Sequence, residues 1–293
     1  MKKITVDQNG EINTIQKAFD LINDNEEAII YLKPGIYFEK LKLTKSNVKI
    51  IGESSSETII SFNDYAKKIK DGLELVTFRT YTLMILADNV TLENITIENT
   101  SGCGKKFGQS VALSTTGNNI TINNCRLISY QDTLFLGPLP RDLIVRYQGF
   151  LPDDELIYPL EHNVFINNTY IEGDVDYVFG CGHAIFNNCV FFSKEREGFV
   201  FAPSTELDDN GGFEIDNCIF TSNYKVPHVY LARPWRDYGK VTIINSKMDN
   251  HIYDVGYDKW NDTNRDKTCR FNESNCSYFD NHKFERVYFV NKK

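Results

Sequence analysis

The sequence predicts an all-β fold, a parallel β-helix in which a single chain winds into stacked coils. A short strand pattern of mostly alternating apolar residues, ending at an asparagine, recurs six times along the chain, which is too often for chance. The copies are separated by 20 to 44 residues, the spacing of solenoid repeats, whose coils bury their apolar faces only against neighbouring coils. The asparagines on which the copies align are Asn94, Asn124, Asn168, Asn188, Asn217 and Asn245.

The N-terminal end of the solenoid is expected to be closed by an amphipathic capping helix. Four apolar residues between Ile12 and Ile22 recur at helical spacing, around the capping pair Asn13–Thr14. A solenoid needs such a cap because its end strands otherwise expose unpaired backbone groups. Two strands, Ala28–Leu32 and Val48–Ile51, are expected to follow the helix.

Each strand copy ends at an asparagine because this residue tolerates the left-handed backbone conformation and can hydrogen-bond neighbouring backbone groups. Cys125, Cys189 and Cys218 directly follow an aligned asparagine, so we expect their thiols to stack as an interior ladder of small buried groups. Cys269 and Cys276 form either a local disulfide or two free thiols, and the sequence leaves both alternatives open.

The last segment, from about Asp258 to Lys293, contains no copy of the aligned repeat and is rich in asparagine, aspartate and aromatic residues. We therefore expect it to pack as external loops along the outside of the solenoid. No stretch rich in proline, glycine or serine divides the 293 residues, so the prediction is one domain spanning residues 1–293.

Composition and charge narrow the range of partners. With 41% apolar and 25% charged residues, the chain has ample material for a folded core. A formal net charge of −8 disfavours nucleic acid and anionic membrane surfaces as partners. No apolar run approaches the roughly 20 residues that span a bilayer, and Met1–Gly10 lacks the apolar core of a signal peptide. We expect a cytoplasmic protein if Met1 is the native start, or alternatively a secreted protein whose signal has been removed.

Two aspartates in apolar surroundings are the strongest candidates for chemistry. Asp132 follows the aligned Asn124 by eight residues, and Asp176 follows Asn168 by the same eight. Equal offsets place both side chains at equivalent points on neighbouring coils, whose strands stack about 4.8 Å apart. The two carboxyl groups are therefore expected to be close neighbours.

Two carboxylates at that distance repel each other, so one tends to hold a proton at a pH where the other is ionised. Such a pair supplies a nucleophile and a general acid in one site. The alternative is a ladder of structural aspartates that hydrogen-bond turns, as in many solenoids. Spacing alone leaves the two interpretations open, and the polar residues nearby favour chemistry.

Three polar side chains suit a site around these aspartates. Gln109 and Gln131 present neutral amide donors, which can stabilise a developing oxyanion without competing as bases. Arg233 offers the guanidinium that usually pairs with a carboxylate that must stay ionised and oriented.

Aromatic residues adjoin these candidates in the sequence. Trp235 lies two residues after Arg233, and Tyr177 and Phe179 follow Asp176. Together the three rings are expected to form a stacking platform for sugar rings.

Five motifs together resemble the pectin methylesterase family, the carbohydrate esterases built on a right-handed parallel β-helix. The resemblance covers most of the chain, from Ile4 to about Trp260, and the motifs stand in the family's order. Each motif alone is weak, and only their combination is specific. The motifs are Gly35–Glu39, Gly108–Leu113, Tyr130–Leu134, Val175–Gly180 and Leu231–Trp235.

The resemblance implies a role for each candidate residue. Asp176 matches the nucleophile that attacks the methyl-ester carbonyl of a galacturonate unit. Asp132 matches the acid/base that protonates departing methanol and then activates water. Gln109 and Gln131 match the oxyanion donors, and Arg233 matches the residue that holds the nucleophile.

The resemblance also implies the partners. Trp235 matches the substrate platform, and the substrate is methyl-esterified homogalacturonan or oligogalacturonides. This scheme requires no metal and no organic cofactor, and we expect a monomer. One departure matters: the segment Leu136–Glu161 stands where the family usually has a shorter connection, between the two aspartates. A long loop beside a site is often a lid or a specificity element.

Other functions remain as alternatives. A serine hydrolase would use Ser110 in Gly108–Ala112, but this segment lacks the second glycine of a nucleophile elbow. A pectate lyase or a polygalacturonase would share the solenoid, yet neither accounts for two glutamines beside the aspartates. A non-catalytic pectin-binding β-helix would bind the polymer without releasing methanol.

The histidines show no spacing typical of metal ligands, and we expect them at the surface or packed against neighbours. Of the five histidines, His183 is the candidate for a position at the border of the cleft, through the segment Cys181–His183. The five are His162, His183, His228, His251 and His282.

Overall fold

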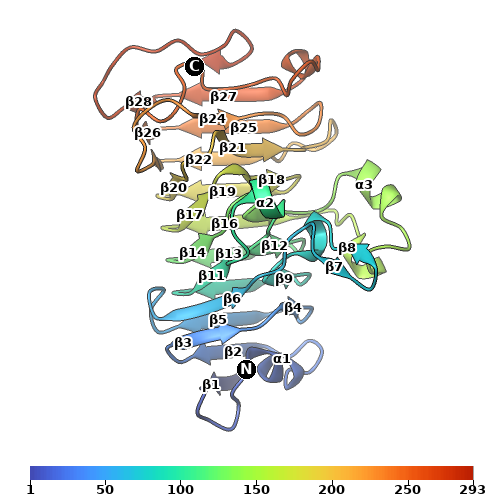
Figure 1. Ribbon diagram of the computed structural model, residues 1–293. Helices are drawn as coiled ribbons and strands as arrows, with labels where there is room; N and C mark the ends of the chain where they lie inside the picture. The colour runs from blue at the N-terminus through green and yellow to red at the C-terminus, as the bar shows by residue number, and fades with distance from the viewer. Residues whose placement is uncertain (293) are drawn as a thin grey trace.

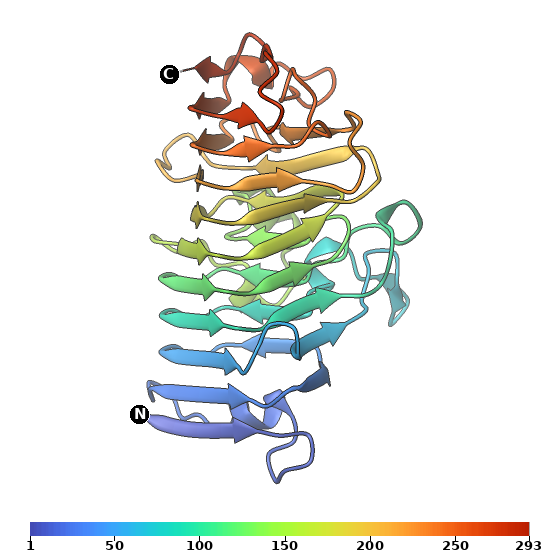
Figure 2. The ribbon, with the colours of Figure 1, turned by 90° about the vertical axis from the view of Figure 1, so that its left-hand side faces the viewer.

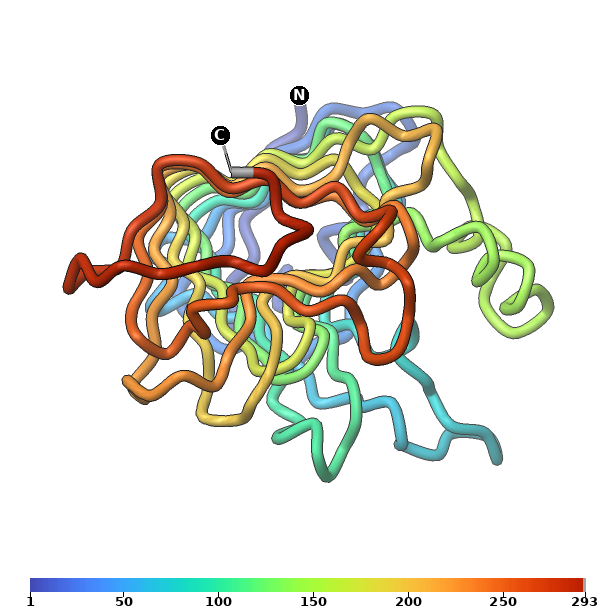
Figure 3. The backbone as a smooth tube through the Cα atoms, turned by 90° about the horizontal axis from the view of Figure 1, so that it is seen from above, coloured from blue at the N-terminus to red at the C-terminus, as the bar shows by residue number. Residues whose placement is uncertain are grey.

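The computed structural model describes residues 1–292, and these residues form a right-handed parallel β-helix of three sheets that run the length of the stack (Figures 1 and 2). Seen from above, the coils superpose and the longer loops project outward (Figure 3). Buried apolar side chains fill the space that the coils enclose. Within the described residues, no helix has the length and apolar character that crossing a bilayer requires.

The first sheet has eleven strands and carries the aligned repeat. In stacking order they are β1 (Lys2–Val6), β2 (Ala28–Leu32), β5 (Val48–Gly52), β10 (Val90–Glu93), β13 (Ile120–Asn123), β16 (Asn163–Asn167), β19 (His183–Asn187), β22 (Phe213–Asp216), β25 (Lys240–Ile244), β27 (Arg270–Ser274) and β29 (Asn291–Lys292).

The second sheet has nine strands and follows the asparagine turn in each coil that contains one. They are β3 (Gly35–Phe38), β6 (Thr58–Phe62), β11 (Thr96–Asn99), β14 (Arg126–Ile128), β17 (Tyr170–Gly173), β20 (Val190–Ser193), β23 (Ile219–Thr221), β26 (Lys247–Met248) and β28 (Ser277–Tyr278).

The third sheet has seven strands and bears the candidate site. They are β4 (Leu41–Leu43), β9 (Leu83–Ile85), β12 (Leu113–Thr115), β15 (Leu134–Leu136), β18 (Val175–Gly180), β21 (Gly198–Pro203) and β24 (Val229–Ala232).

Short helices and one hairpin lie at the end of the stack or in the loops. The hairpin (β7–β8) and helix α3 project from the side of the stack (Figure 1). These elements are α1 (Ile15–Asp20), the hairpin β7 (Ile69–Lys70) and β8 (Leu73–Glu74), the 3-10 turn η1 (Thr77–Arg79), α2 (Gly104–Phe107), α3 (Arg141–Arg146), and the 3-10 turns η2 (Asp153–Glu155) and η3 (Arg265–Lys267).

The expected N-terminal cap is present. Helix α1 begins behind Thr14, whose hydroxyl accepts a hydrogen bond from the backbone N–H of Lys17 at 3.2 Å. Ile15, Phe19 and Ile22 are buried against the first coils. The cap therefore covers the apolar end of the interior.

The aligned asparagines all adopt the left-handed conformation, with φ between 49° and 55°. Asn tolerates this conformation at little cost, so each coil turns sharply from the first sheet into the second. Successive coils are also bonded through these side chains: the amide of Asn217 donates to Oδ1 of Asn188 at 2.6 Å. The repeat is thus a repeated turn as well as a repeated strand.

The cysteine ladder is confirmed, with hydroxyl residues completing it. Cys125, Cys189 and Cys218 are buried, and the backbone N–H of Cys189 donates to Sγ of Cys218 at 3.3 Å. The backbone N–H of Cys218 in turn donates to Oγ of Ser246 at 3.1 Å. Small side chains at this position therefore join successive coils from inside.

Both cysteines for which a local bridge remained open, Cys269 and Cys276, are free thiols.

The expectation that residues 258–293 form only external loops is wrong. Strand β27 belongs to a further coil. It pairs in register with β25, and the residue that follows it, Asn275, has the left-handed conformation (φ 51°). The copy is hard to recognise because Glu273 occupies the inward position held by Ile243 on the coil below. A charged residue at a core position masks the apolar pattern.

Glu273 is tolerated in the interior because Arg286 is buried with it. Nε of Arg286 donates to Oε2 of Glu273 at 2.9 Å, and NH2 donates to Oε1 at 3.0 Å. The hydroxyl of Tyr257 also donates to Glu273 at 2.9 Å. This ion pair ties the chain after β28 to the last coils and completes the C-terminal end of the stack.

Replacing Arg286 by methionine should lower the free energy of unfolding by about 3–5 kcal/mol, because Glu273 is left charged and unpaired in the interior. Chemical denaturation followed by circular dichroism measures the effect. The double variant Glu273→Leu/Arg286→Met should regain most of the loss. A single variant as stable as the parent protein would contradict this account of the C-terminal end.

Candidate active site

The register of the third sheet brings the two predicted aspartates together. Strands β15 and β18 pair in parallel, with Leu134 opposite Val178. Asp132 and Asp176 each lie two residues before these partners, so they occupy equivalent positions on adjacent coils. Both line the same cleft. Their backbones share the left-handed conformation, with φ of 66° and 50°.

The cleft lies outside the third sheet and has a volume of about 420 Å³. Its floor contains the aspartates, and one wall comes from α3. Of the residues expected at the site, the cleft is lined by Gln109, Gln131, Asp132, Asp176, Phe179, Arg233 and Trp235.

Arg233 holds Asp176 in a two-pronged ion pair. Nε donates to Oδ1 at 2.9 Å, and NH2 donates to Oδ2 at 2.6 Å. The guanidinium is itself held between two rings, 3.8 Å from the centre of Phe199 and 3.9 Å from that of Trp260. Both carboxylate oxygens of Asp176 are therefore oriented by a cation that has little freedom to move.

The two carboxyl groups differ in their tendency to hold a proton. Burial and the neighbouring charge of Asp176 raise the pKa of Asp132 well above its ordinary value. Burial also raises the pKa of Asp176, but the hydrogen bonds and charge of Arg233 oppose that shift. We assign the shared proton to Asp132 and the negative charge to Asp176, because only Asp176 has a bidentate cation.

The two glutamines lie at the edge of the same cleft. The backbone carbonyl of Gln131 accepts a hydrogen bond from Ser110 N–H at 2.9 Å, which fixes the coil carrying Gln131 to the one below. The side-chain oxygen of Gln131 faces Arg196 NH1 at 3.4 Å. This contact leaves its NH2 group as the end that can donate into the cleft.

The aromatic predictions have mixed outcomes. The rings of Trp235 and Phe179 lie edge to face with centres 5.7 Å apart, and both line the cleft. The expected role of Tyr177 in substrate binding is wrong. Its side chain is fully buried inside the β-helix, against Gly173, and its hydroxyl bonds Ser193 at 3.1 Å. Strand β18 is irregular between Val175 and Val178, where its register against β21 shifts and Asp176 has a left-handed backbone. The usual alternation of faces is interrupted there, so Tyr177 points inward although Phe179, two residues further on, lines the cleft.

Several cleft residues carried no recognisable signal in the sequence. Trp260 belongs to a segment without any motif, and Phe78 comes from η1. The long segment 136–161 was notable for its length, and it places α3 against the cleft. The further lining residues are Thr77, Leu143, Arg146, Tyr147, Ala202 and Arg236.

Helix α3 is fixed at the cleft by a second two-pronged ion pair. Arg236 donates through Nε and NH2 to the carboxylate of Asp142, at 3.0 and 2.8 Å. Arg236 directly follows Trp235, so the pair joins α3 to the stretch that carries the predicted substrate platform.

Ser110 and His183 do not belong to this site. Ser110 is fully buried, and its hydroxyl bonds Ser129 at 2.9 Å. His183 bonds Asn163 through Nδ1 at 2.9 Å and is not among the residues that line the cleft. A serine nucleophile with a histidine base is therefore incompatible with this arrangement.

The fold and the cleft define a parallel β-helix protein in which two neighbouring carboxyl groups line one cleft. The family model described as Pectinesterase matches residues 2–138 and 144–293. The chain belongs to the pectinesterase family, whose members are carboxylic ester hydrolases.

Individual relatives agree with this placement. Pectinesterase 31 of Arabidopsis thaliana is 27% identical, over 94% of this chain and 82% of the relative. A pectinesterase of Petunia integrifolia is 32% identical, over 89% of this chain and 66% of the relative.

Solved structures show the same fold. A pectin methylesterase in complex with a hexasaccharide aligns with a TM-score of 0.83 at 24% identity, covering all of this chain and 93% of the other. The Aspergillus niger pectin methylesterase in deglycosylated form gives 0.79 at 25% identity, covering 99% of this chain and 89% of the other.

The proton on Asp132 has a measurable consequence for stability. In the unfolded chain this carboxyl ionises above about pH 3.9, whereas in the folded protein it keeps its proton to a higher pH. Ionisation of the unfolded state therefore lowers the free energy of unfolding as the pH rises. Asp132→Asn should stabilise the protein at pH 7 and have little effect below pH 4, as thermal melts at both pH values would show.

The matched variant is Asp176→Asn, at the equivalent point of the next coil. It removes the partner of Arg233 and should destabilise the protein at pH 7. Destabilisation of similar size by both variants would contradict the assignment of the proton to Asp132.

Proposed function

We propose that this chain removes methyl esters from galacturonate units of pectin, with Asp176 as nucleophile and Asp132 as acid/base. The observation that carries the proposal is the pairing, in one cleft, of a carboxylate held by Arg233 with a neighbouring carboxyl of strongly raised pKa. A nucleophile and a proton donor stand side by side at the same pH.

The first half of the reaction forms an acyl-enzyme. Oδ of Asp176 attacks the carbonyl carbon of the methyl ester, and the carbonyl electrons move onto its oxygen. The amide N–H groups of Gln109 and Gln131 stabilise this oxyanion. As the tetrahedral intermediate collapses, the bond to the methoxy oxygen breaks, and Asp132 gives that oxygen its proton. Methanol leaves, and an anhydride joins the galacturonate carboxyl to Asp176.

The second half restores the enzyme. Asp132, now ionised, takes a proton from a water molecule, whose oxygen attacks the galacturonate carbonyl carbon. The second tetrahedral intermediate releases the carboxylate of Asp176, again oriented by Arg233, and Asp132 has its proton back. The products are methanol and one galacturonic acid unit.

The character of the cleft supports an acidic sugar chain as substrate. Arg146 brings a positive charge to one wall, whereas the charge of Arg236 is paired with Asp142, and Trp235 and Phe179 present ring surface. A structurally similar pectin methylesterase was solved with a hexasaccharide. Both methyl-esterified homogalacturonan and oligogalacturonides fit the proposal, and we propose that the protein acts as a monomer.

The reaction is tested by following methanol and acid release from methylated pectin. Asp176→Asn should reduce kcat by at least about 10³-fold, because an amide cannot replace the nucleophile. Ser110→Ala is the control and should retain activity, since this hydroxyl contacts only the interior. Undiminished methanol release by Asp176→Asn would refute the proposed nucleophile. Unsaturated products would indicate a lyase, new reducing ends a polygalacturonase, and binding without products a non-catalytic protein.

Trp235 should act mainly in binding. Trp235→Ala is expected to raise KM about tenfold, the equivalent of about 1.4 kcal/mol of lost ring contact, with a smaller change in kcat. Trp260→Ala is the matched comparison: Trp260 packs on Arg233, so its loss should lower kcat more than it raises KM. Initial-rate kinetics on one pectin preparation separates the two. The reverse pattern would contradict these roles.

A further inference from the structure

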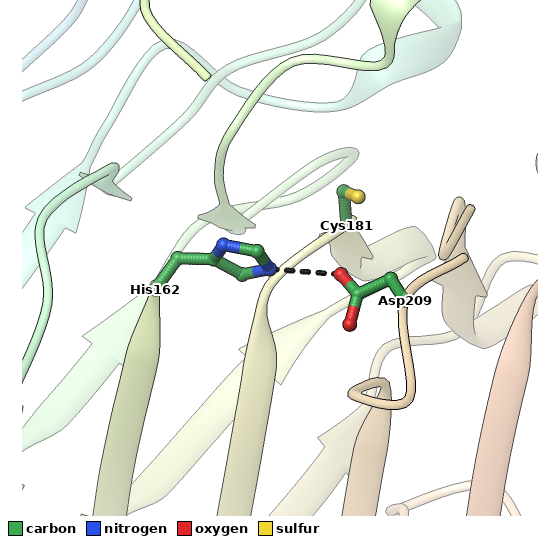
Figure 4. A group of neighbouring side chains, drawn as sticks. All are labelled: His162, Cys181 and Asp209. Carbon is green, nitrogen blue, oxygen red and sulfur yellow. Dashed lines mark hydrogen bonds and ion pairs between the residues drawn. The ribbon is translucent and has the colours of Figure 1, made fainter. Parts of the chain in front are cut away.

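A second group of reactive side chains lies outside the cleft, at the base of the long segment 136–161. His162 follows this segment, Cys181 directly follows β18, and Asp209 lies in the loop between β21 and β22. One nitrogen, one sulfur and one oxygen of these residues all lie within 4.8 Å of one another. The imidazole of His162 and the carboxylate of Asp209 face each other, with Nε2 and Oδ2 2.9 Å apart, and the side chain of Cys181 lies beside this pair (Figure 4).

We propose that His162, Cys181 and Asp209 bind a transition-metal ion, with Zn²⁺ as the best fit. Imidazole, thiolate and carboxylate are the ligands that zinc takes in proteins, at about 2.0–2.3 Å. Ligand atoms around a tetrahedral zinc are therefore roughly 3.3–3.7 Å apart. The 2.9 Å separation between His162 Nε2 and Asp209 Oδ2 must therefore open by about 0.4 Å, and Sγ of Cys181, which lies within 4.8 Å of both, must move closer by about 1 Å at most.

Backbone and side-chain donors already orient two of the ligands. The hydroxyl of Tyr158 is 3.2 Å from Sγ of Cys181, which also receives a hydrogen bond from the backbone of Glu206. The N–H of Gly211 donates to Oδ1 of Asp209 at 2.7 Å and leaves Oδ2 to face His162. Outer contacts of this kind hold ligands in place around metals.

The burial of the group determines how it would bind. His162 and Cys181 are buried, while the side chain of Asp209 is 18% exposed and offers a path for entry. Burial raises the pKa of the Cys181 thiol to about 11, against the opposing hydrogen bonds of Tyr158 and Glu206. The metal must displace the thiol proton to bind the sulfur.

The histidine limits the affinity. Nδ1 of His162 is buried without a hydrogen-bond partner among the described residues, whereas tightly bound zinc usually has a histidine oriented through its second nitrogen. Absence of that partner typically weakens a site about 10–100-fold. We therefore expect reversible binding that a chelator can remove.

A metal here would connect the base of the cleft wall to the coils. The loop carrying Asp209 also holds α3: Arg141 NH2 donates to Asp208 at 2.8 Å, and Arg141 N–H donates to Glu206 at 3.3 Å. The segment 136–161 would thus be held at two points. The ion would bind His162, which follows the segment, and the loop that carries Asp209 would hold helix α3. Its role is structural, and the ester chemistry does not pass through it.

The test is metal binding by chelator-treated full-length protein, read without any activity assay. Titration with Co²⁺ should give a 1:1 complex with a near-ultraviolet thiolate-to-cobalt absorption, and Zn²⁺ should displace it and raise the thermal midpoint. Cys181→Ser should abolish the absorption. Cys103→Ser, which changes an exposed thiol, should leave it unchanged.

The variant Asp209→Asn distinguishes the loss of a metal ligand from a folding defect. This nearly isosteric change should weaken Zn²⁺ binding at least tenfold while leaving the thermal midpoint of the metal-free protein close to that of the parent. Absence of 1:1 binding by the parent at pH 8, or an absorption that survives Cys181→Ser, would overturn the proposal and leave the group as a buried histidine–aspartate hydrogen bond beside a thiol. Neither result bears on methanol release, so the proposed function is tested separately.

Discussion

The parallel, in-register stacking of coils is the constraint on which the site depends. From β10 to β27, each strand of the first sheet is followed by an asparagine in the left-handed conformation, so the turn recurs at the same point of successive coils. Asp132 and Asp176 stand eight residues after two such asparagines, so the turn fixes their register as well as that of the strands. A shift of one residue on either coil would point a carboxyl into the interior. Asp132 and Asp176 therefore lie close together because the repeat is regular in the two coils that carry them.

Buried charged groups have two kinds of surroundings in this protein. In the interior, Glu273 and Arg286 neutralise each other and hold the last coils together. In the cleft, Arg233 hydrogen-bonds the carboxylate of Asp176 through two nitrogens and makes no such contact with Asp132. The second carboxyl, Asp132, is left to hold a proton, since burial and a neighbouring negative charge both disfavour its ionised form. Unequal pairing therefore gives two residues of the same type different tendencies to hold a proton, as the proposed acid and nucleophile require.

The sequence predicts what repeats, and its errors occur where the repeat is masked or absent. Most strands of the first sheet, the cap, the cysteine ladder and the juxtaposition of the two aspartates follow from periodicity and equal offsets. Tyr177 was misplaced because a motif suggests a role without indicating which face of the strand a residue occupies. The coil at β27 was missed because Glu273 replaces an inward apolar residue. Trp260 reaches the site from a non-repeating segment, whose path only tertiary packing decides.

The long segment 136–161 shows how such a fold can vary its cleft without disturbing its chemistry. It leaves the coil of Asp132 and returns on the coil of Asp176, and the strands before and after it pair in unbroken register. Lengthening a loop whose ends are fixed adds little to the entropic cost of closing it. The length of this connection can therefore change with little effect on the stability of the fold. The ion pair between Arg236 and Asp142 then sets where the added helix lies. Catalytic geometry is thus determined by the coils, and the shape of one cleft wall by the segment that joins them.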